Sequence, residues 1–221
     1  MKNLIILSTL IFLSVLGNTF AKTQGHYVDF NIIRTDLSAL YNVYSTSGAS
    51  NSYSKSDNSE FRGIGDDDKI SVGIAYKYAY NFDNGIYVAP IVFFDYSNVK
   101  AGSYATSLYK YKLDYRYGIK TNLGYDITDK FSLYSNMGVA YNKYEVRQRP
   151  TSTAKNSSVD PSFLYGFGTK YSIAENVDLN FELELSKVTM EEPRSASVGI
   201  YTSGKTRFNT RTLRFGLSYR F

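Results

Sequence analysis

The feature that most constrains this chain is an alternation of residue type with a period of two. Between residues 109 and 127, every odd position except Thr121 is apolar or aromatic, whereas the even positions carry Lys, Asp, Arg, Asn or Gly. Successive side chains of a β-strand point to opposite faces, so this stretch predicts a strand with one apolar and one polar face. The same pattern, less tidy in places, predicts eight strands, near 26–37, 70–80, 86–97, 109–127, 131–145, 163–173, 177–185 and 206–221.

The connections between these strands alternate in length. Short turns lie at 81–85, 126–130 and 174–176, whereas longer polar stretches lie near 38–66, 98–107, 146–160 and 190–205. In an up-and-down antiparallel sheet, alternate connections fall at opposite ends. All short turns then share one end and all long loops the other, which is typical of transmembrane β-barrels.

The polarity of the two faces selects among all-β folds. A soluble barrel turns its apolar face inward, but an eight-stranded barrel is only just wide enough for its own side chains. This chain has 22 Tyr and 14 Phe, yet a mean hydropathy of −0.29. Turning the aromatic face toward lipid and the small or charged face toward a narrow lumen accommodates both facts. The sequence therefore predicts an all-β, eight-stranded antiparallel up-and-down transmembrane β-barrel without a water-filled pore.

The pattern of the N-terminal residues predicts an export signal. Lys2 precedes a mostly apolar stretch from Leu4 to Leu16, and Thr19-Phe20-Ala21 follows as a cleavage site. A membrane-spanning helix needs about 20 apolar residues, so a cleaved signal peptide is favoured over a retained anchor. We expect residues 1–21 to be the signal peptide and residues 22–221 to be one barrel domain.

Charged residues on the polar face should lie in the lumen and pair there. Asp95 and Arg116 fall on neighbouring strands, and the strand with Glu182 and Glu184 lies between those with Lys170 and Arg214. Paired interior charge is the usual filling of such a barrel. The predicted lumenal network comprises Lys77, Asp95, Asp114, Arg116, Lys120, Lys170, Glu182, Glu184 and Arg214.

Composition argues against catalysis, cofactors and metals. The chain has no Cys and a single His, so thiolate chemistry and His-rich metal sites are excluded. His26 would begin the first strand, where no Ser-His-acid arrangement is expected. The acidic run at 65–69 does not have the spacing of an EF-hand loop. The net charge of +5 is not concentrated in a Lys/Arg run, so nucleic acid is not an expected partner.

The long connections carry positive charge and small polar residues. Residues 45–60 contain seven Ser, a composition that predicts a mobile loop. A basic rim is predicted at the same end, formed by Arg147, Arg149, Lys155, Arg194, Lys205 and Arg207. This rim could attract anionic lipopolysaccharide phosphates or host glycans, or it could be ordinary solvated loop charge.

With eight amphipathic strands, alternating loop lengths, an export signal and a terminal Phe, the chain resembles the small eight-stranded outer-membrane barrels of Gram-negative bacteria, the opacity-protein/OmpX-like porin family. The resemblance implies that the last strand is the signal read by the barrel-assembly machinery. The matching alternate residues are Leu213, Phe215, Leu217, Tyr219 and Phe221. It also implies a bacterial outer-membrane location, with extracellular loops, periplasmic termini, and outer-membrane lipids and lipopolysaccharide as surroundings.

The expected function is that of a non-enzymatic surface protein whose external loops serve cell-surface interaction, adhesion to a host-cell ligand, or envelope integrity. The alternative is a narrow porin-like channel or a conduit for hydrophobic ligands. A soluble periplasmic barrel is a third possibility.

Overall fold

The computed structural model describes residues 23–47, 54–61, 70–82, 84–102, 109–148, 155–191, 195–197 and 200–221. The predicted signal peptide, the acidic run at 65–69, Arg149 and Arg194 lie outside these residues. Among the described residues, no helix is long and apolar enough to cross a membrane. The strands are β1 (Gly25–Ser47), β2 (Ser54–Phe61), β3 (Ser71–Asn81), β4 (Ile86–Gly102), β5 (Tyr109–Asp126), β6 (Phe131–Gln148), β7 (Lys155–Ala174), β8 (Val177–Glu191), β9 (Ser195–Ser197) and β10 (Ile200–Arg220).

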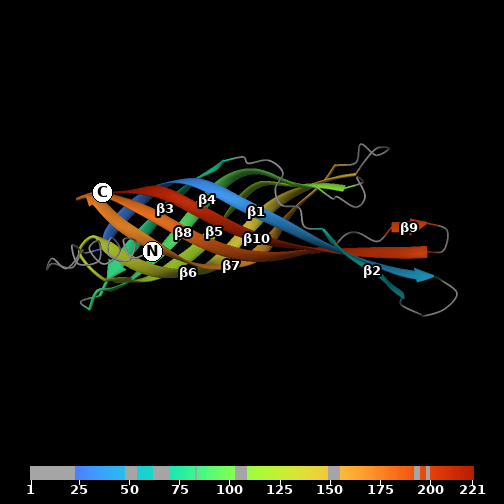
Figure 1. The fold of residues 1–221 in the computed structure, drawn as a ribbon, viewed down its shortest axis with the longest axis horizontal. Coiled ribbons are helices and arrows are strands. Elements are labelled where there is room, and N and C mark those ends of the chain that lie inside the picture. The colour runs from blue at the N-terminus through green and yellow to red at the C-terminus, as the bar shows by residue number, and fades with distance from the viewer. Residues whose placement is uncertain are drawn as a thin grey trace, which may run out of the picture.

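Eight of these strands form a closed barrel. Each pairs with the next in the order β1-β3-β4-β5-β6-β7-β8-β10, and β10 pairs back onto β1 (Figure 1). The ladders between neighbouring barrel strands are antiparallel. The predicted all-β, eight-stranded up-and-down barrel is therefore confirmed.

The strands at the long-loop end reach further than the sequence predicted. The β1–β10 ladder continues to Ser47↔Ile200, and β2 and β9 pair with the extended ends of β1 and β10. These four strands make a sheet beyond the barrel, called here the projecting sheet (Figure 1). The prediction of irregular loops at 38–66 and 190–205 was thus partly wrong, because polar strands outside a membrane have the composition of loops.

The predicted orientation of the two faces holds along most of the barrel. Apolar residues of alternate positions point outward, such as Ile74, Ile119 and Phe167, with 47%, 64% and 61% of their surface exposed. The intervening polar residues, such as Lys120 and Glu184, are buried in the lumen. The aromatic-rich face is therefore the outer surface.

A β-bulge reverses this pattern in β5. The pairing of β5 with β6 shifts register between Leu113 and Tyr115. Leu113, placed by the simple alternation on the outer face, is fully buried inside the barrel. The extra residue of a bulge exchanges the two faces of the strand on one side of it, and period counting does not detect this.

The interior has three levels along the barrel. Tyr27, Ala79, Tyr87, Ala89 and Tyr134 pack together toward the short-turn end. The middle holds buried charged residues beside a small apolar group of Ala75, Ile91, Phe93, Ala140 and Leu164. Toward the long-loop end lies a third apolar group, called here the outer apolar cluster, formed by Leu37, Val99, Leu113, Tyr144, Val188 and Phe208.

Candidate functional site

Six buried charged side chains meet in the middle of the lumen. Asp95 and Arg116 are paired across β4 and β5, whereas Glu182 and Arg214 are paired across β8 and β10. Glu184 lies two residues beyond Glu182 on the same face of β8, and Lys120 completes the group from β5. Their side chains are at most 6% exposed. We call these six residues the lumenal charge cluster.

Short contacts join the two sides of this cluster across the lumen. The Arg214 guanidinium donates to both oxygens of Asp95, with Nη1–Oδ1 at 2.7 Å and Nη2–Oδ2 at 2.6 Å. Arg116 Nε donates to Asp95 Oδ2 at 2.6 Å, and Arg116 also donates to Glu184. Lys120 donates to Glu182 and, at 3.2 Å, to Glu184 Oε2. Three cations thus neutralise three carboxylates, and the contacts fasten β4 and β5 to β8 and β10.

An aromatic ring supports the cations of this cluster. Phe93 points into the lumen from β4, and the charged groups of Arg116, Lys120 and Arg214 lie 5.4–5.7 Å from its centroid. These distances allow cation–π attraction. The ring also occupies lumenal volume beside the ion pairs.

A second set of polar contacts lies nearer the short-turn end. Lys77 Nζ is 3.0 Å from an oxygen of Asp29, and Lys170 Nζ is 3.9 Å from Asp126. Thr23 donates its hydroxyl to Asp126 at 2.7 Å. Neither carboxylate was among the predicted residues of the lumenal network. Asp29 shares a face of β1 with other inward residues, but the alternation of that strand is too weak for its face to be predicted. Asp126 is on the predicted polar face of the strand 109–127, but it also begins the predicted turn 126–130 and was not included in the network.

One predicted member of the lumenal network lies elsewhere. Asp114 is half-buried and contacts Lys112 Nζ at 2.7 Å on its own strand. Asp114 lies within the bulge of β5, so it does not share the inward face on which Arg116 and Lys120 lie. The structure therefore places eight of the nine predicted residues in the lumen. The prediction that Asp114 belongs to the lumenal network was wrong.

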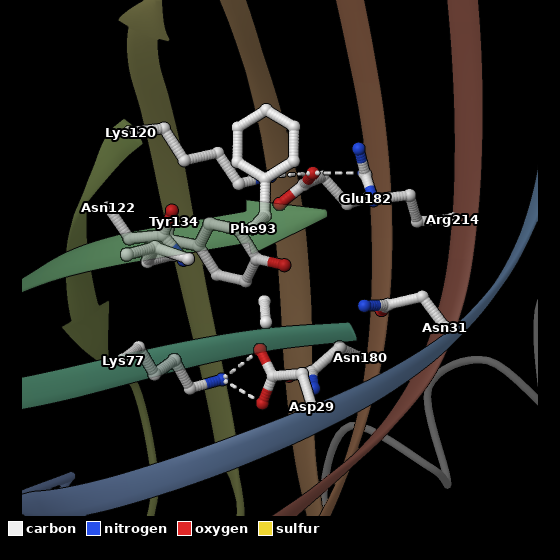
Figure 2. A pocket seen from close by; sticks show the side chains of 12 residues that line it. Asp29, Asn31, Lys77, Phe93, Lys120, Asn122, Tyr134, Asn180, Glu182 and Arg214 are labelled. Atoms are coloured by element: carbon white, nitrogen blue, oxygen red, sulfur yellow. Dashed lines mark hydrogen bonds and ion pairs between the residues drawn. The ribbon is translucent and has the colours of Figure 1, made fainter. Parts of the chain in front are cut away.

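The lumen has almost no free volume at this level. A cavity of about 20 Å³ is bounded by Asp29, Lys77, Lys120, Glu182 and Arg214. Figure 2 shows these side chains and the ion pairs among them. Such a volume holds about one water molecule. The charged residues therefore fill the barrel at this point and leave no space for a solute.

The described residues contain no group of three or more His, Cys, Asp or Glu side chains that could hold a metal ion. His26 lies on the outer face of β1, with Nδ1 2.6 Å from the Tyr76 hydroxyl and its ring centroid 4.8 Å from that of Tyr78. Its ring therefore belongs to the outward aromatic surface.

The last residue of the chain closes the seam of the barrel. The Phe221 backbone N–H donates to the His26 carbonyl at 3.1 Å, and the two rings stack with centroids 5.9 Å apart. The alternate apolar residues of the predicted assembly signal all point outward, namely Leu213, Phe215, Leu217, Tyr219 and Phe221. Their recognition by assembly machinery stays a prediction.

The predicted basic rim is described only in part. The backbones of Arg147, Lys155 and Lys205 lie in β6, β7 and β10, and not in loops. Arg207, also in β10, has an exposed side chain.

Comparison with known proteins matches the chain to one family model and to outer-membrane proteins. A model of the OmpA-like transmembrane domain matches residues 94–221, more than half of the chain. Outer membrane protein X of Escherichia coli strain K12 is 32% identical over 132 residues, which cover 60% of this chain and 71% of that protein. Outer membrane protein X of Enterobacter cloacae is 29% identical over 135 residues, with the same coverage.

Two solved structures are also similar. Ail, the attachment invasion locus protein of Yersinia pestis, has a TM-score of 0.45 at 18% identity, covering 90% of this chain and 100% of that one. Neisserial surface protein A has a TM-score of 0.47 at 14% identity, covering 90% and 98%.

Proposed function

The chain belongs to the OmpA-like transmembrane domain family and is an outer-membrane β-barrel protein, and from this premise we propose that it serves cell-surface interaction through its projecting sheet. Its long-loop end faces the exterior and its termini the periplasm. The partner is an extended polypeptide of an external protein, such as one on a host cell. Catalysis has no part in this function.

The observation that carries the proposal is the continuation of β1 and β10 beyond the barrel. Their ladder runs from Tyr27↔Arg220 to Ser47↔Ile200 without a register shift, so the barrel wall passes directly into the projecting sheet. Such a sheet is held rigidly above the membrane, and binding residues are often presented in this way on a fixed scaffold.

The edge of the projecting sheet supports the choice of partner. β2 pairs with β1 from Ala39↔Phe61 to Ser45↔Ser54, and within the described residues no strand lies along its other side. An edge strand offers unpaired backbone N–H and C=O groups, which can pair with an added strand. Main-chain pairing gives affinity for extended segments of many sequences.

The filled lumen argues against the alternative function, a channel or a hydrophobic-ligand conduit. The lumenal charge cluster joins opposite walls, and the outer apolar cluster lies between it and the long-loop end. A solute would have to break buried ion pairs, each costing about 3–5 kcal/mol when one partner is left alone.

Cell binding and protease shaving test the proposal together. Residues 54–61 are replaced by a Gly-Ser segment of equal length, and adhesion of cells that display the protein to host-cell monolayers is compared with wild type. A matched control replaces the equal-length stretch 155–162 of β7, away from β2. We expect loss of adhesion for the first variant alone, and protease fragments cut at the long-loop end. Equal adhesion of both variants, or cleavage at 126–130, would contradict the proposal.

A further inference from the structure

The outer wall of the barrel changes character abruptly toward the long-loop end. On β1 the outward residue Ile32 is 55% exposed, and the next outward residue is Arg34. On β10 the outward Leu213 is followed in the same direction by Arg211. Beyond the level of Arg34 and Arg211 the interior becomes apolar, since Leu37 and Phe208, which follow the buried Thr35 and Thr210, belong to the outer apolar cluster. Above this level the barrel has an apolar interior and a charged outer surface, as a water-soluble barrel does. The edge of the hydrocarbon layer therefore lies beside Ile32 and Leu213.

Four outward cations gather directly above that edge on three adjacent strands. Lys187 of β8 is opposite Asn209 of β10, so Arg207 and Arg211 are its diagonal neighbours on the same face. Arg34 of β1 is opposite Leu213 and hence diagonal to Arg211. Diagonal positions across an antiparallel pair are about 7–8 Å apart, within reach of long side chains. We call Arg34, Lys187, Arg207 and Arg211 the cationic patch.

The charge of this patch is not balanced by nearby acids. Among the outward side chains described on these stretches of β1, β8 and β10, the single acid is Asp36. It lies opposite Arg211, and its carboxylate is 3.8 Å from Arg34 Nε. Four cations therefore face one carboxylate, which leaves an excess of three positive charges. Cations at neighbouring positions repel one another, and a bound anion would relieve that repulsion.

We propose that the cationic patch binds the phosphate groups of a phosphorylated lipid in the outer leaflet. The patch supplies the headgroup contacts, because arginine binds phosphate through paired N–H donors. The exposed apolar residues beneath it, Leu213, Phe215 and Ile32, supply the surface for the acyl chains. The proposal takes its orientation from the proposed function but is independent of any contact made by the projecting sheet.

Lipid-linked stabilisation of the full chain tests this site. The protein is folded into phosphatidylcholine nanodiscs, and lipid A is titrated in as the phosphorylated lipid. A ligand that binds the folded state stabilises it, so the rise in the midpoint of urea unfolding gives the apparent affinity. Arg211→Gln is compared with Lys130→Gln, which removes the same charge from an exposed residue at the short-turn end. We expect about tenfold weaker binding for Arg211→Gln, unchanged binding for Lys130→Gln, and an intermediate loss for Arg211→Lys, which keeps the charge but not the paired N–H donors.

Three results would overturn the proposal. One is equal affinity for wild type and Arg211→Gln, provided that both variants migrate as folded, heat-modifiable protein. Another is an equal loss for Lys130→Gln, which would indicate general charge attraction. The third is that soluble pyrophosphate stabilises the protein as strongly as lipid A, which would assign the patch to free phosphate. Failure of the adhesion experiment leaves these readouts unaffected.

Discussion

Replacing Asp95 by Asn should destabilise the barrel far more than the very small change in side-chain size suggests. Asn keeps the shape of the side chain but removes its charge, so the lumenal charge cluster passes from three cations and three carboxylates to an excess of one cation. Asp95 accepts three hydrogen bonds from Arg116 and Arg214, all at 2.6–2.7 Å and all buried. Removing one partner of a buried ion pair costs about 3–5 kcal/mol, because the remaining charge has no compensation.

A matched replacement in β5, the strand next to that of Asp95, provides the control. Asp114→Asn makes the same chemical change in the pair with Lys112, whose side chains are 19% and 24% exposed. Because water reaches this pair, we expect a loss of about 1 kcal/mol or less. The free energy of unfolding is measured by urea titration in phosphatidylcholine vesicles, with the folded fraction read from heat-modifiable migration and tyrosine fluorescence.

A second variant separates charge balance from packing. Asp95→Asn combined with Arg214→Met restores two cations against two carboxylates. The double variant should therefore lose less stability than the two single losses added, with a coupling energy of about 2 kcal/mol. The reasoning is refuted if Asp95→Asn costs no more than Asp114→Asn, or if the two changes are additive.

Three further predictions follow from other contacts. Gly73→Ala should cost about 1–3 kcal/mol in the same urea titration, because a Cβ there would lie 2.4 Å from the Asp95 carboxylate and 2.8 Å from Ile33 Cδ1; unchanged stability would mean that Asp95 has room to move. Phe208→Ala should cost about 3–5 kcal/mol, because Phe208 is fully buried and stacks on Tyr144 at 4.5 Å; Phe163→Ala on the outer face is its control and should cost less. Deletion of Phe221 should lower the amount of heat-modifiable barrel in cells while leaving spontaneous folding into vesicles nearly intact; an equal defect in both would mean that the contact with His26, and not recognition, is what matters.

The barrel itself could be predicted because its signal is repeated. Each membrane-crossing stretch must be apolar on one face, so residues such as Ile74 and Phe167 show the period of two without any knowledge of their neighbours. The inward charges followed from the same alternation. Their partners did not, because Arg116 and Glu184 are 68 positions apart and meet only across a closed lumen.

The errors have equally local causes. The bulge between Leu113 and Tyr115 exchanges inward and outward positions, so Leu113 was placed on the wrong face and Asp114 in the wrong group. β2 and the outer half of β1 were read as loop because no lipid imposes an apolar face on them. The cations Arg34, Lys187 and Arg211 were missed because they become neighbours only through strand pairing.

The outer apolar cluster has a practical consequence for engineering. Since the segment above the membrane has its own packed centre between Leu37, Leu113 and Phe208, changes beyond it need not be transmitted to the ion pairs below. Foreign peptides grafted between β1 and β2, or between β9 and β10, would lie beyond this packed centre and away from the lumenal charge cluster. With the proposed orientation of the barrel, such peptides would be displayed on the outside of the cell.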